Sequence, residues 1–166
     1  MTAYNETCAA ISMVYLFERM FLLHGESKYI DCMERTLYNG VISGMSMDGG
    51  RFFYPNPLSS DGKYKFNADG NTTRQPWFGC ACCPSNLCRF IPSVPGYLYG
   101  VKDNNIYVNL FAGNTSTIKV NGKDVVLEET TEYPWNGDVK IAVKKSGVKN
   151  ANLLVRIPGW VRNQVV

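Results

Sequence analysis

A long apolar run near the N-terminus constrains the fold more than any other feature of the sequence. Between Ala9 and Leu23, 12 of 15 residues are apolar or aromatic, and on the helix that they predict they surround the whole circumference. His24 and Gly25 follow, a basic residue and a glycine of the kind that commonly end helices. The run includes charged residues and is shorter than the ~20 apolar residues that span a bilayer, so no membrane-spanning segment is predicted.

A second helix is predicted directly after the first, with Ser27 as its N-cap. Its apolar residues recur at spacings of three and four, which places them on one face: Ile30, Met33, Leu37 and Val41. The two helices should pack as an antiparallel hairpin. One amphipathic helix covers only part of the apolar one, so the rest needs either another chain or further polypeptide before Met1. We favour the second, and expect the chain to be truncated at both ends.

The residues after this hairpin are rich in turn-forming types. Residues 43–80 contain many Gly, Ser, Asn, Asp and Pro, which predicts a long excursion with little regular structure. Loops of this length are usually functional. A short helix is predicted at residues 86–94, because Pro84 suits a first helical turn.

From Gly96 onward, apolar and polar residues alternate in the two-residue period of strands, and about five short strands are predicted. Asn121–Gly122 and Asn136–Gly137 are each a signal for a two-residue hairpin turn. We therefore predict an α+β fold in which residues 1–95 form a helical domain and residues 96–166 form an antiparallel β domain.

The charge pattern and the N-terminus restrict the partners and the compartment. The chain has 17 Lys and Arg against 14 Asp and Glu, a net charge of +3, and no basic run longer than Lys144 with Lys145. Nucleic acid is therefore not an expected partner, and neither is a membrane. No secretion signal is recognisable, and thiol ligands persist best in a reducing compartment, so a cytoplasmic protein is predicted.

Cysteine carries the clearest chemical signal, because four of the six cysteines lie within the nine residues of Cys80–Cys88. Cys82 and Cys83 are neighbours that could join only through a strained ring, so a disulfide framework is not expected. Zinc sites use Cys, His and carboxylate ligands, often as two close pairs from separate segments. Glu6 with Cys8, and Cys82 with Cys83, are two such pairs. Spacing alone leaves this metal site and ordinary buried cysteines equally open.

Four motifs occur together and in order: YNETCA at 4–9, RFFYPNPL at 51–58, WFGCACCPSN at 77–86 and IPGW at 157–160. In this combination the chain resembles the family 127 glycoside hydrolases, the β-L-arabinofuranosidase type, over almost its whole length. The resemblance implies that the helices are the last ones of an (α/α)6 barrel that holds the active site. It also implies that the strands belong to a β-sandwich domain that follows the barrel.

The resemblance further implies a zinc ion held by Glu6, Cys8, Cys82 and Cys83, with Cys82 as the catalytic nucleophile. Tyr54 matches a position that contacts the sugar in the family, although packing within an extended segment explains it equally well. The general acid/base Glu and the substrate-binding histidines of the family would lie upstream of this chain. The implied function is part of a retaining exo-glycosidase that releases L-arabinofuranose, or a related sugar, from a carbohydrate substrate.

This piece alone is expected to be inactive, because the acid/base Glu is not within it. The alternative is a non-catalytic zinc-stabilised or carbohydrate-binding module, in which the cysteines only stabilise a loop. Self-association into a homo-oligomer stays open.

Overall fold

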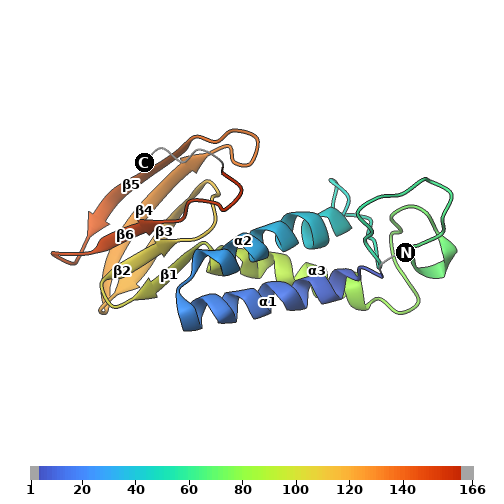
Figure 1. Ribbon diagram of the computed structural model, residues 1–166, viewed down its shortest axis with the longest axis horizontal. Helices are drawn as coiled ribbons and strands as arrows, with labels where there is room; N and C mark the ends of the chain where they lie inside the picture. Colours follow the sequence, from blue (N-terminus) through green and yellow to red (C-terminus); the bar gives the residue numbers. More distant parts are fainter. Residues whose placement is uncertain (1–3, 162–166) are drawn as a thin grey trace. The chain divides into compact units, whose positions relative to one another are not determined.

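The computed structural model describes residues 4–161 of the 166-residue chain. The chain separates into two compact units, residues 1–94 and residues 95–166. Helices form the regular structure of the first unit, and strands form that of the second (Figure 1). The predicted mixture of helices and antiparallel strand pairs is therefore confirmed.

The first unit is built on three α-helices and several shorter helical turns. Its α-helices are α1 (Thr7–His24), α2 (Ser27–Thr36) and α3 (Cys82–Phe90). The unit also contains a π-helical turn, Leu37–Val41, short 3-10 turns at Ile42–Gly44 and Ala68–Gly70, and the start of a 3-10 helix, Ile91–Tyr97. Helix α2 runs back along α1, so the predicted antiparallel hairpin is confirmed, and α3 packs beside α1 (Figure 1).

Local end signals were correct for α1 and wrong for α2. Helix α1 ends at His24, and Gly25 follows in the left-handed conformation, with φ of 71° and its N–H donating to the Phe21 carbonyl at 2.7 Å. The predicted N-cap of α2 was wrong, because Ser27 lies inside the helix and Glu26 precedes it without a side-chain cap. The Glu26 carboxylate instead pairs with Lys28 at 2.6 Å.

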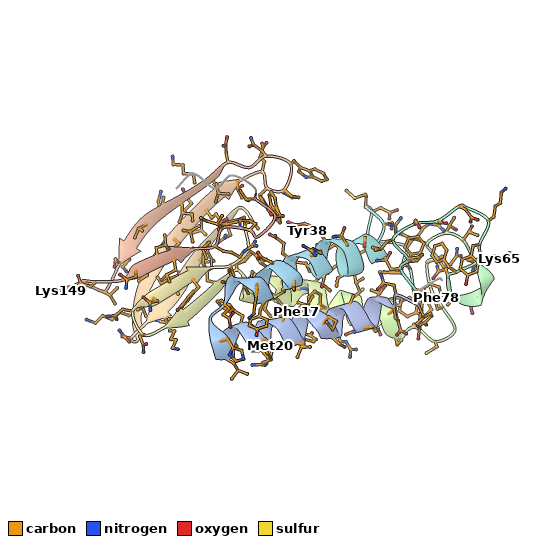
Figure 2. All side chains as sticks on the ribbon, in the orientation of Figure 1. Phe17, Met20, Tyr38, Lys65, Phe78 and Lys149 are labelled. Atoms are coloured by element: carbon orange, nitrogen blue, oxygen red, sulfur yellow. The ribbon has the colours of Figure 1, made fainter. Side chains whose placement is uncertain are left out.

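The face of α1 that meets α2 is buried, and the opposite face is not. The predicted apolar stripe of the second helix is almost fully buried: Ile30, Met33, Leu37 and Val41. Gly40 allows the close approach, since a side chain there would meet the Ala10 Cβ at 2.9 Å. Large apolar side chains remain exposed along α1: Met13, Tyr15, Leu16, Leu22 and Leu23. Figure 2 shows Phe17 and Met20 extending from the same helix.

Helix α1 is also long and apolar enough, by length and composition, to cross a membrane. Its mean hydropathy is 1.2 and 28% of it is buried. Core helices of globular proteins pass the same test. The covering of its exposed face by polypeptide outside the chain stays a prediction.

The segment between the π-helical turn and α3 contains no long helix or strand, as predicted. Single bridges tie it together, joining Phe52 to both Met45 and Gln75. The buried side chain of Asn67 accepts hydrogen bonds from the N–H groups of Tyr54 and Ala68 and donates to the Thr73 carbonyl. One buried amide therefore organises backbone groups that no regular element pairs.

Helix α3 starts earlier than predicted. It begins at Cys82, not near Asn86, and Pro84 lies in its first turn, where the absent N–H of proline costs nothing. After Phe90 the chain tightens into a 3-10 helix, Ile91–Tyr97, which contains Pro95. The early start places both neighbouring cysteines within the first helical turn.

The second unit contains two three-stranded sheets. Its strands are β1 (Tyr99–Lys102), β2 (Asn105–Val108), β3 (Asn114–Val120), β4 (Lys123–Thr131), β5 (Val139–Ser146) and β6 (Asn152–Val155). One sheet has the order β1-β2-β6 and the other has the order β3-β4-β5 (Figure 1). A buried cluster draws on β2, β3 and β4 and so joins the two sheets: Ile106, Ile118, Val120, Val125 and Leu127.

Two details of the β domain differ from the prediction. Strand β6 pairs with β2 in parallel, because the chain passes through the whole second sheet before it returns. Asn121 and Gly122 form the predicted tight turn, with φ of 50° and 75°. Asn136–Gly137 does not, since residues 132–138 all lie between β4 and β5 and the Asn136 side chain accepts from the Asp138 N–H.

Candidate metal centre

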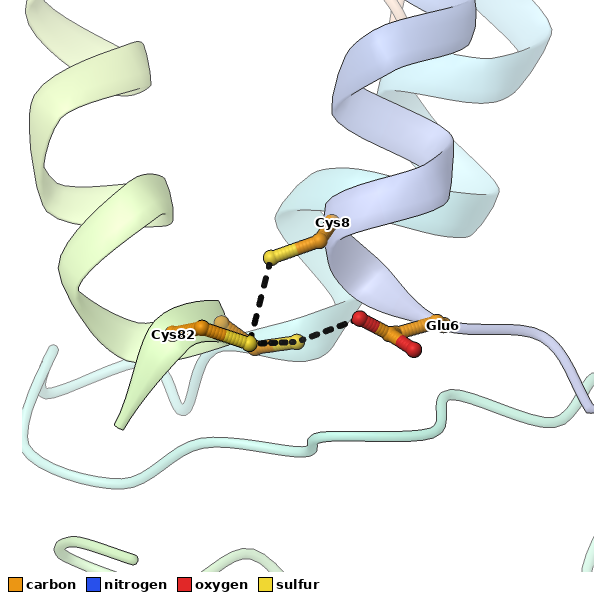
Figure 3. Close-up of side chains that lie close together, drawn as sticks. Glu6, Cys8 and Cys82 are labelled. Carbon is orange, nitrogen blue, oxygen red and sulfur yellow. Dashed lines mark hydrogen bonds between the residues drawn. The ribbon is translucent and has the colours of Figure 1, made fainter. Parts of the chain in front are cut away.

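Four potential ligands from two distant segments converge at the starts of α1 and α3. Glu6 directly precedes α1, Cys8 lies in its first turn, and Cys82 and Cys83 open α3. Their ligand atoms all lie within 4.8 Å of one another. Figure 3 shows the Cys8 and Cys82 sulfurs and the Glu6 carboxylate turned toward one another. The structure thus brings together all four residues that the sequence singled out as ligands.

The spacing of these atoms fits a tetrahedral ion. The Sγ atom of Cys82 lies 3.8 Å from that of Cys8 and 3.9 Å from that of Cys83. The Cys83 Sγ lies 3.7 Å from Glu6 Oε1. Two sulfurs bound to zinc at about 2.3 Å in a tetrahedron are about 3.8 Å apart. All six cysteines are free thiols, so no disulfide competes for these sulfurs.

The long segment positions the start of α1 through direct hydrogen bonds. The Thr7 N–H donates to the Tyr54 carbonyl at 3.0 Å, and the Thr7 hydroxyl donates to the Phe53 carbonyl at 3.1 Å. Asn5 donates its side-chain N–H to the Asn56 carbonyl at 2.8 Å. These bonds lie on both sides of Glu6 in the sequence, so the segment at 53–56 fixes the backbone that carries two of the four ligands.

Packing between the helices positions the other two ligands. Leu87 and Phe90 are buried on α3, and the Phe90 ring meets Tyr15 of α1 edge-on at 5.6 Å between centroids. This contact packs the end of α3 against the middle of α1, and the 3.8 Å between the Cys8 and Cys82 sulfurs shows that the first turns of the two helices also lie side by side. Helix N-termini carry partial positive charge and favour thiolates and carboxylates, which are the groups found here.

The three sulfurs of the cluster have different environments. Cys82 is exposed, and a hydrogen bond with the Tyr54 hydroxyl lowers the pKa of its thiol. Cys83 is fully buried, and burial raises the pKa of its thiol. Burial also raises the pKa of the Cys8 thiol, which a hydrogen bond with Asn86 partly offsets. Among the three, Cys82 is the sulfur that is both accessible and most easily ionised.

Tyr54 lies at the cluster, with its hydroxyl 2.7 Å from the Cys82 sulfur. This hydrogen bond raises the pKa of the Tyr54 phenol. The Phe78 ring packs edge-on against the tyrosine ring at 5.7 Å. The family resemblance implied a sugar contact for Tyr54, with packing equally open, and neither interpretation foresaw its contact with the sulfur, because the two residues are 28 positions apart.

Other cysteines do not join the cluster. Cys32, Cys80 and Cys88 are all exposed, and none belongs to the group of converging ligand atoms. Sequence reasoning also missed Tyr4. Burial, and then the nearby Glu6 carboxylate, raise the pKa of its phenol. Its place at the start of the YNETCA motif, two residues before a predicted ligand, was the available signal.

Comparisons with known proteins place the chain in a family. The profile of the β-L-arabinofuranosidase GH127 catalytic domain matches residues 1–96, and that of the GH127 middle domain matches residues 105–166. A non-reducing end β-L-arabinofuranosidase of Bifidobacterium longum subsp. longum is 34% identical over 169 residues, which cover 97% of this chain and 25% of the relative. The chain therefore belongs to the GH127 family of glycoside hydrolases.

Solved structures of the family share the fold described above. A GH127 β-arabinofuranosidase is 57% identical with a TM-score of 0.86, covering 95% of this chain and 24% of that one. A GH127 β-L-arabinofuranosidase from Geobacillus stearothermophilus T6 is 41% identical with a TM-score of 0.83, covering 96% of this chain and 26% of that one. The chain thus spans about a quarter of the length of the relatives it matches.

Proposed function

We propose that the chain carries the metal centre and the nucleophile of a retaining exo-glycosidase that releases L-arabinofuranose, or a related sugar, from a carbohydrate. The observation that carries the proposal is the convergence of Glu6, Cys8, Cys82 and Cys83 within 4.8 Å, in a chain of the GH127 family. Relatives named as β-L-arabinofuranosidases supply the substrate class. In this proposal residues 1–95 complete an (α/α)6 barrel and residues 96–166 begin a β-sandwich domain.

Zinc is the ion that this donor set favours. Three thiolates and one carboxylate match its preference for sulfur, nitrogen and oxygen ligands in a tetrahedron. When bound, the ion would keep the Cys82 sulfur deprotonated at neutral pH while tempering its reactivity. Cys82 would bind the ion together with Glu6, Cys8 and Cys83.

Cys82 is the sulfur best suited to attack a sugar. It is exposed, whereas Cys83 is fully buried and Cys8 is partly covered. A retaining glycosidase needs a nucleophile on one face of the anomeric carbon and an acid above the leaving oxygen. The thiolate forms a bond to the anomeric carbon as the glycosidic bond breaks, and the acid protonates the departing oxygen.

The acid/base is the missing component. Within residues 4–161, no carboxylate other than Glu6 belongs to the cluster of converging ligand atoms. The family resemblance assigns the role to a Glu upstream of the chain, so we propose that turnover requires the native full-length protein. A cytoplasmic location fits the reduced thiols and stays a proposal.

A closed structural zinc site is the competing interpretation. In such a site every ligand is shielded and no coordination position opens to a substrate. The exposure of Cys82 beside a tyrosine hydroxyl argues against it. We therefore favour the enzyme over a non-catalytic module.

Replacing the proposed nucleophile tests the function. In the native full-length protein, Cys82→Ser should lower kcat for an arabinofuranoside by about 10⁴-fold or more, as losses of nucleophiles do. Cys88→Ser is the matched control, since Cys88 is an exposed cysteine of the same helix that lies outside the cluster. Turnover by Cys82→Ser at a rate near that of the control would refute the proposal.

A further inference from the structure

The hydroxyl of Tyr54 contacts the atom that would react. It lies 2.7 Å from the Cys82 sulfur. The other two sulfurs of the cluster have different neighbours, since Cys83 lies 3.7 Å from the Glu6 carboxylate and Cys8 lies 3.8 Å from the Cys82 sulfur. A thiolate has no proton to give, so in the ionised state the tyrosine is the donor.

The contact is built by its surroundings. The Tyr54 N–H donates to Asn67 Oδ1 at 2.8 Å, and its carbonyl accepts from the Thr7 N–H at 3.0 Å. Phe78, which is 4% exposed, packs its ring against the tyrosine at an interplanar angle of 83°. Phe78 lies among the loops beside the helix starts in Figure 2. Both backbone polar groups and the ring are thus held, which fixes where the hydroxyl points.

We propose that Tyr54 is a catalytic residue that donates a hydrogen bond to the Cys82 sulfur as it leaves the sugar in the second half of the reaction. This inference rests on the proposed role of Cys82 as the nucleophile. The partner of the tyrosine is then the Cys82 sulfur, and the step in which it acts is the release of the sugar from the enzyme.

The chemistry of the second half of the reaction gains from such a donor. Water forms a bond to the anomeric carbon while the carbon–sulfur bond breaks, and the bonding electron pair returns to sulfur. The proton of the water passes to a carboxylate of the protein outside the described residues. Tyr54 keeps its own proton and stabilises the negative charge that appears on sulfur.

The first half of the reaction, the attack of the sulfur on the sugar, is accelerated less by the same hydrogen bond. In the free enzyme the sulfur is charged and accepts strongly, whereas in the glycosylated enzyme it is a neutral thioether and a weak acceptor. Attack on the sugar therefore weakens the bond to Tyr54, and release of the sugar restores it. Removing the hydroxyl should slow release more than attack, so the glycosylated enzyme should accumulate.

A steady-state and intact-mass experiment on the native full-length protein tests the role. Tyr54→Phe keeps the ring and removes only the hydroxyl. We expect kcat to fall by about 10- to 100-fold, the usual effect of losing a hydrogen bond to a charged group. KM should fall as well, and rapidly quenched samples should carry a pentose on Cys82. Tyr64→Phe is the matched control, because Tyr64 is an exposed tyrosine of the same long segment.

The outcomes separate this inference from the function on which it rests. A tyrosine that only binds the sugar would raise KM in Tyr54→Phe and leave no pentose on the enzyme, which would overturn the inference. Loss of bound metal in Tyr54→Phe would show a structural role and overturn it too. If the unmodified protein shows no turnover, or Cys82→Ser retains it, the proposed function itself fails.

Discussion

Within each of the two units, the contacts that hold the structure together span different separations along the sequence. In the β unit, β3 and β4 are consecutive strands joined by the Asn121–Gly122 turn, and their side chains form the buried cluster around Leu127. In the helical unit, the sulfur of Cys8 meets one that is 74 positions away. Local patterns suffice for the β3–β4 hairpin, whereas the cysteine cluster depends on an irregular segment that long-range polar contacts hold in place. The candidate site lies in the unit that local patterns describe least.

Metal removal should produce the largest difference between the responses of the two units. In the native full-length protein, a chelator that strips the ion should speed amide hydrogen exchange of the 77–90 peptides by about 100-fold or more. The reason is that a metal bound only by the folded state contributes its binding energy to folding. Exchange of the β3 and β4 peptides should be unchanged. Equal acceleration in both units would contradict the comparison.

A substitution in the β core should destabilise the β unit and leave the metal site unchanged. Leu127 is 1% exposed, so Leu127→Ala should lower the free energy of unfolding of the β unit by about 3 kcal/mol through lost burial and a cavity. Denaturant titration followed by hydrogen exchange measures this, with the part-exposed Leu153→Ala as the control. Metal content should stay the same. A parallel loss of metal would mean that the two units are energetically coupled.

Loosening the long segment should affect the site through its scaffold. Asn67→Ala removes a buried amide that bonds the N–H groups of Tyr54 and Ala68, and should cost about 2 kcal/mol. Faster proteolysis between residues 45 and 80 and weaker metal retention are the expected readouts. Asn71→Ala is the matched control, because its side-chain hydrogen bonds are long, at 3.4 Å. If the two variants behave identically, the Asn67 side chain does not hold the long segment at the site.

The smallest expected effect concerns a buried carboxyl in the β unit. Glu129 is 2% exposed and accepts a hydrogen bond from Tyr99, and burial raises the pKa of its carboxyl. The folded state therefore binds this proton more tightly than the unfolded state does. Its contribution to stability is present at low pH and is lost as the pH rises above the unfolded value of about 4.3.

Glu129→Gln should therefore stabilise the β unit by about 1 kcal/mol at pH 7 and by less at pH 4. Denaturant titrations at the two pH values measure the difference. A variant that is less stable than the parent at pH 7 would show that the ionised carboxylate is the favoured form.

The sequence correctly predicted structural features that depend on only a few neighbouring residues. Gly25 ends α1 and Asn121–Gly122 forms a tight turn, because each needs only a left-handed backbone that its residues adopt easily. Ser27 failed as an N-cap because the helix starts one residue earlier than predicted, with Glu26 at the cap position. Asn136–Gly137 failed because the Asn136 side chain accepts from the Asp138 N–H within a longer connection. The direction of β6 was wrong because pairing with β2 depends on the path of the whole second sheet.

The site was predicted less by spacing than by resemblance. Residue spacing left a metal site and ordinary buried cysteines equally open, and only the family motifs joined Glu6 and Cys8 to Cys82 and Cys83. Their convergence depends on contacts such as that of Thr7 with the Tyr54 carbonyl, which no local pattern encodes. The contact of the tyrosine hydroxyl with sulfur belongs to the same class of long-range detail.

We propose that the Glu6–Cys8 pair and the Cys82–Cys83 pair, which come from distant segments, share one metal ion. Elemental analysis with X-ray absorption spectroscopy, on native full-length protein purified without chelators, tests it directly. We expect one zinc per chain, with a first coordination sphere of three sulfurs and one oxygen, at zinc–sulfur distances of about 2.3 Å. A protein that folds and turns over its substrate without metal, or whose zinc has no sulfur ligands, would contradict it.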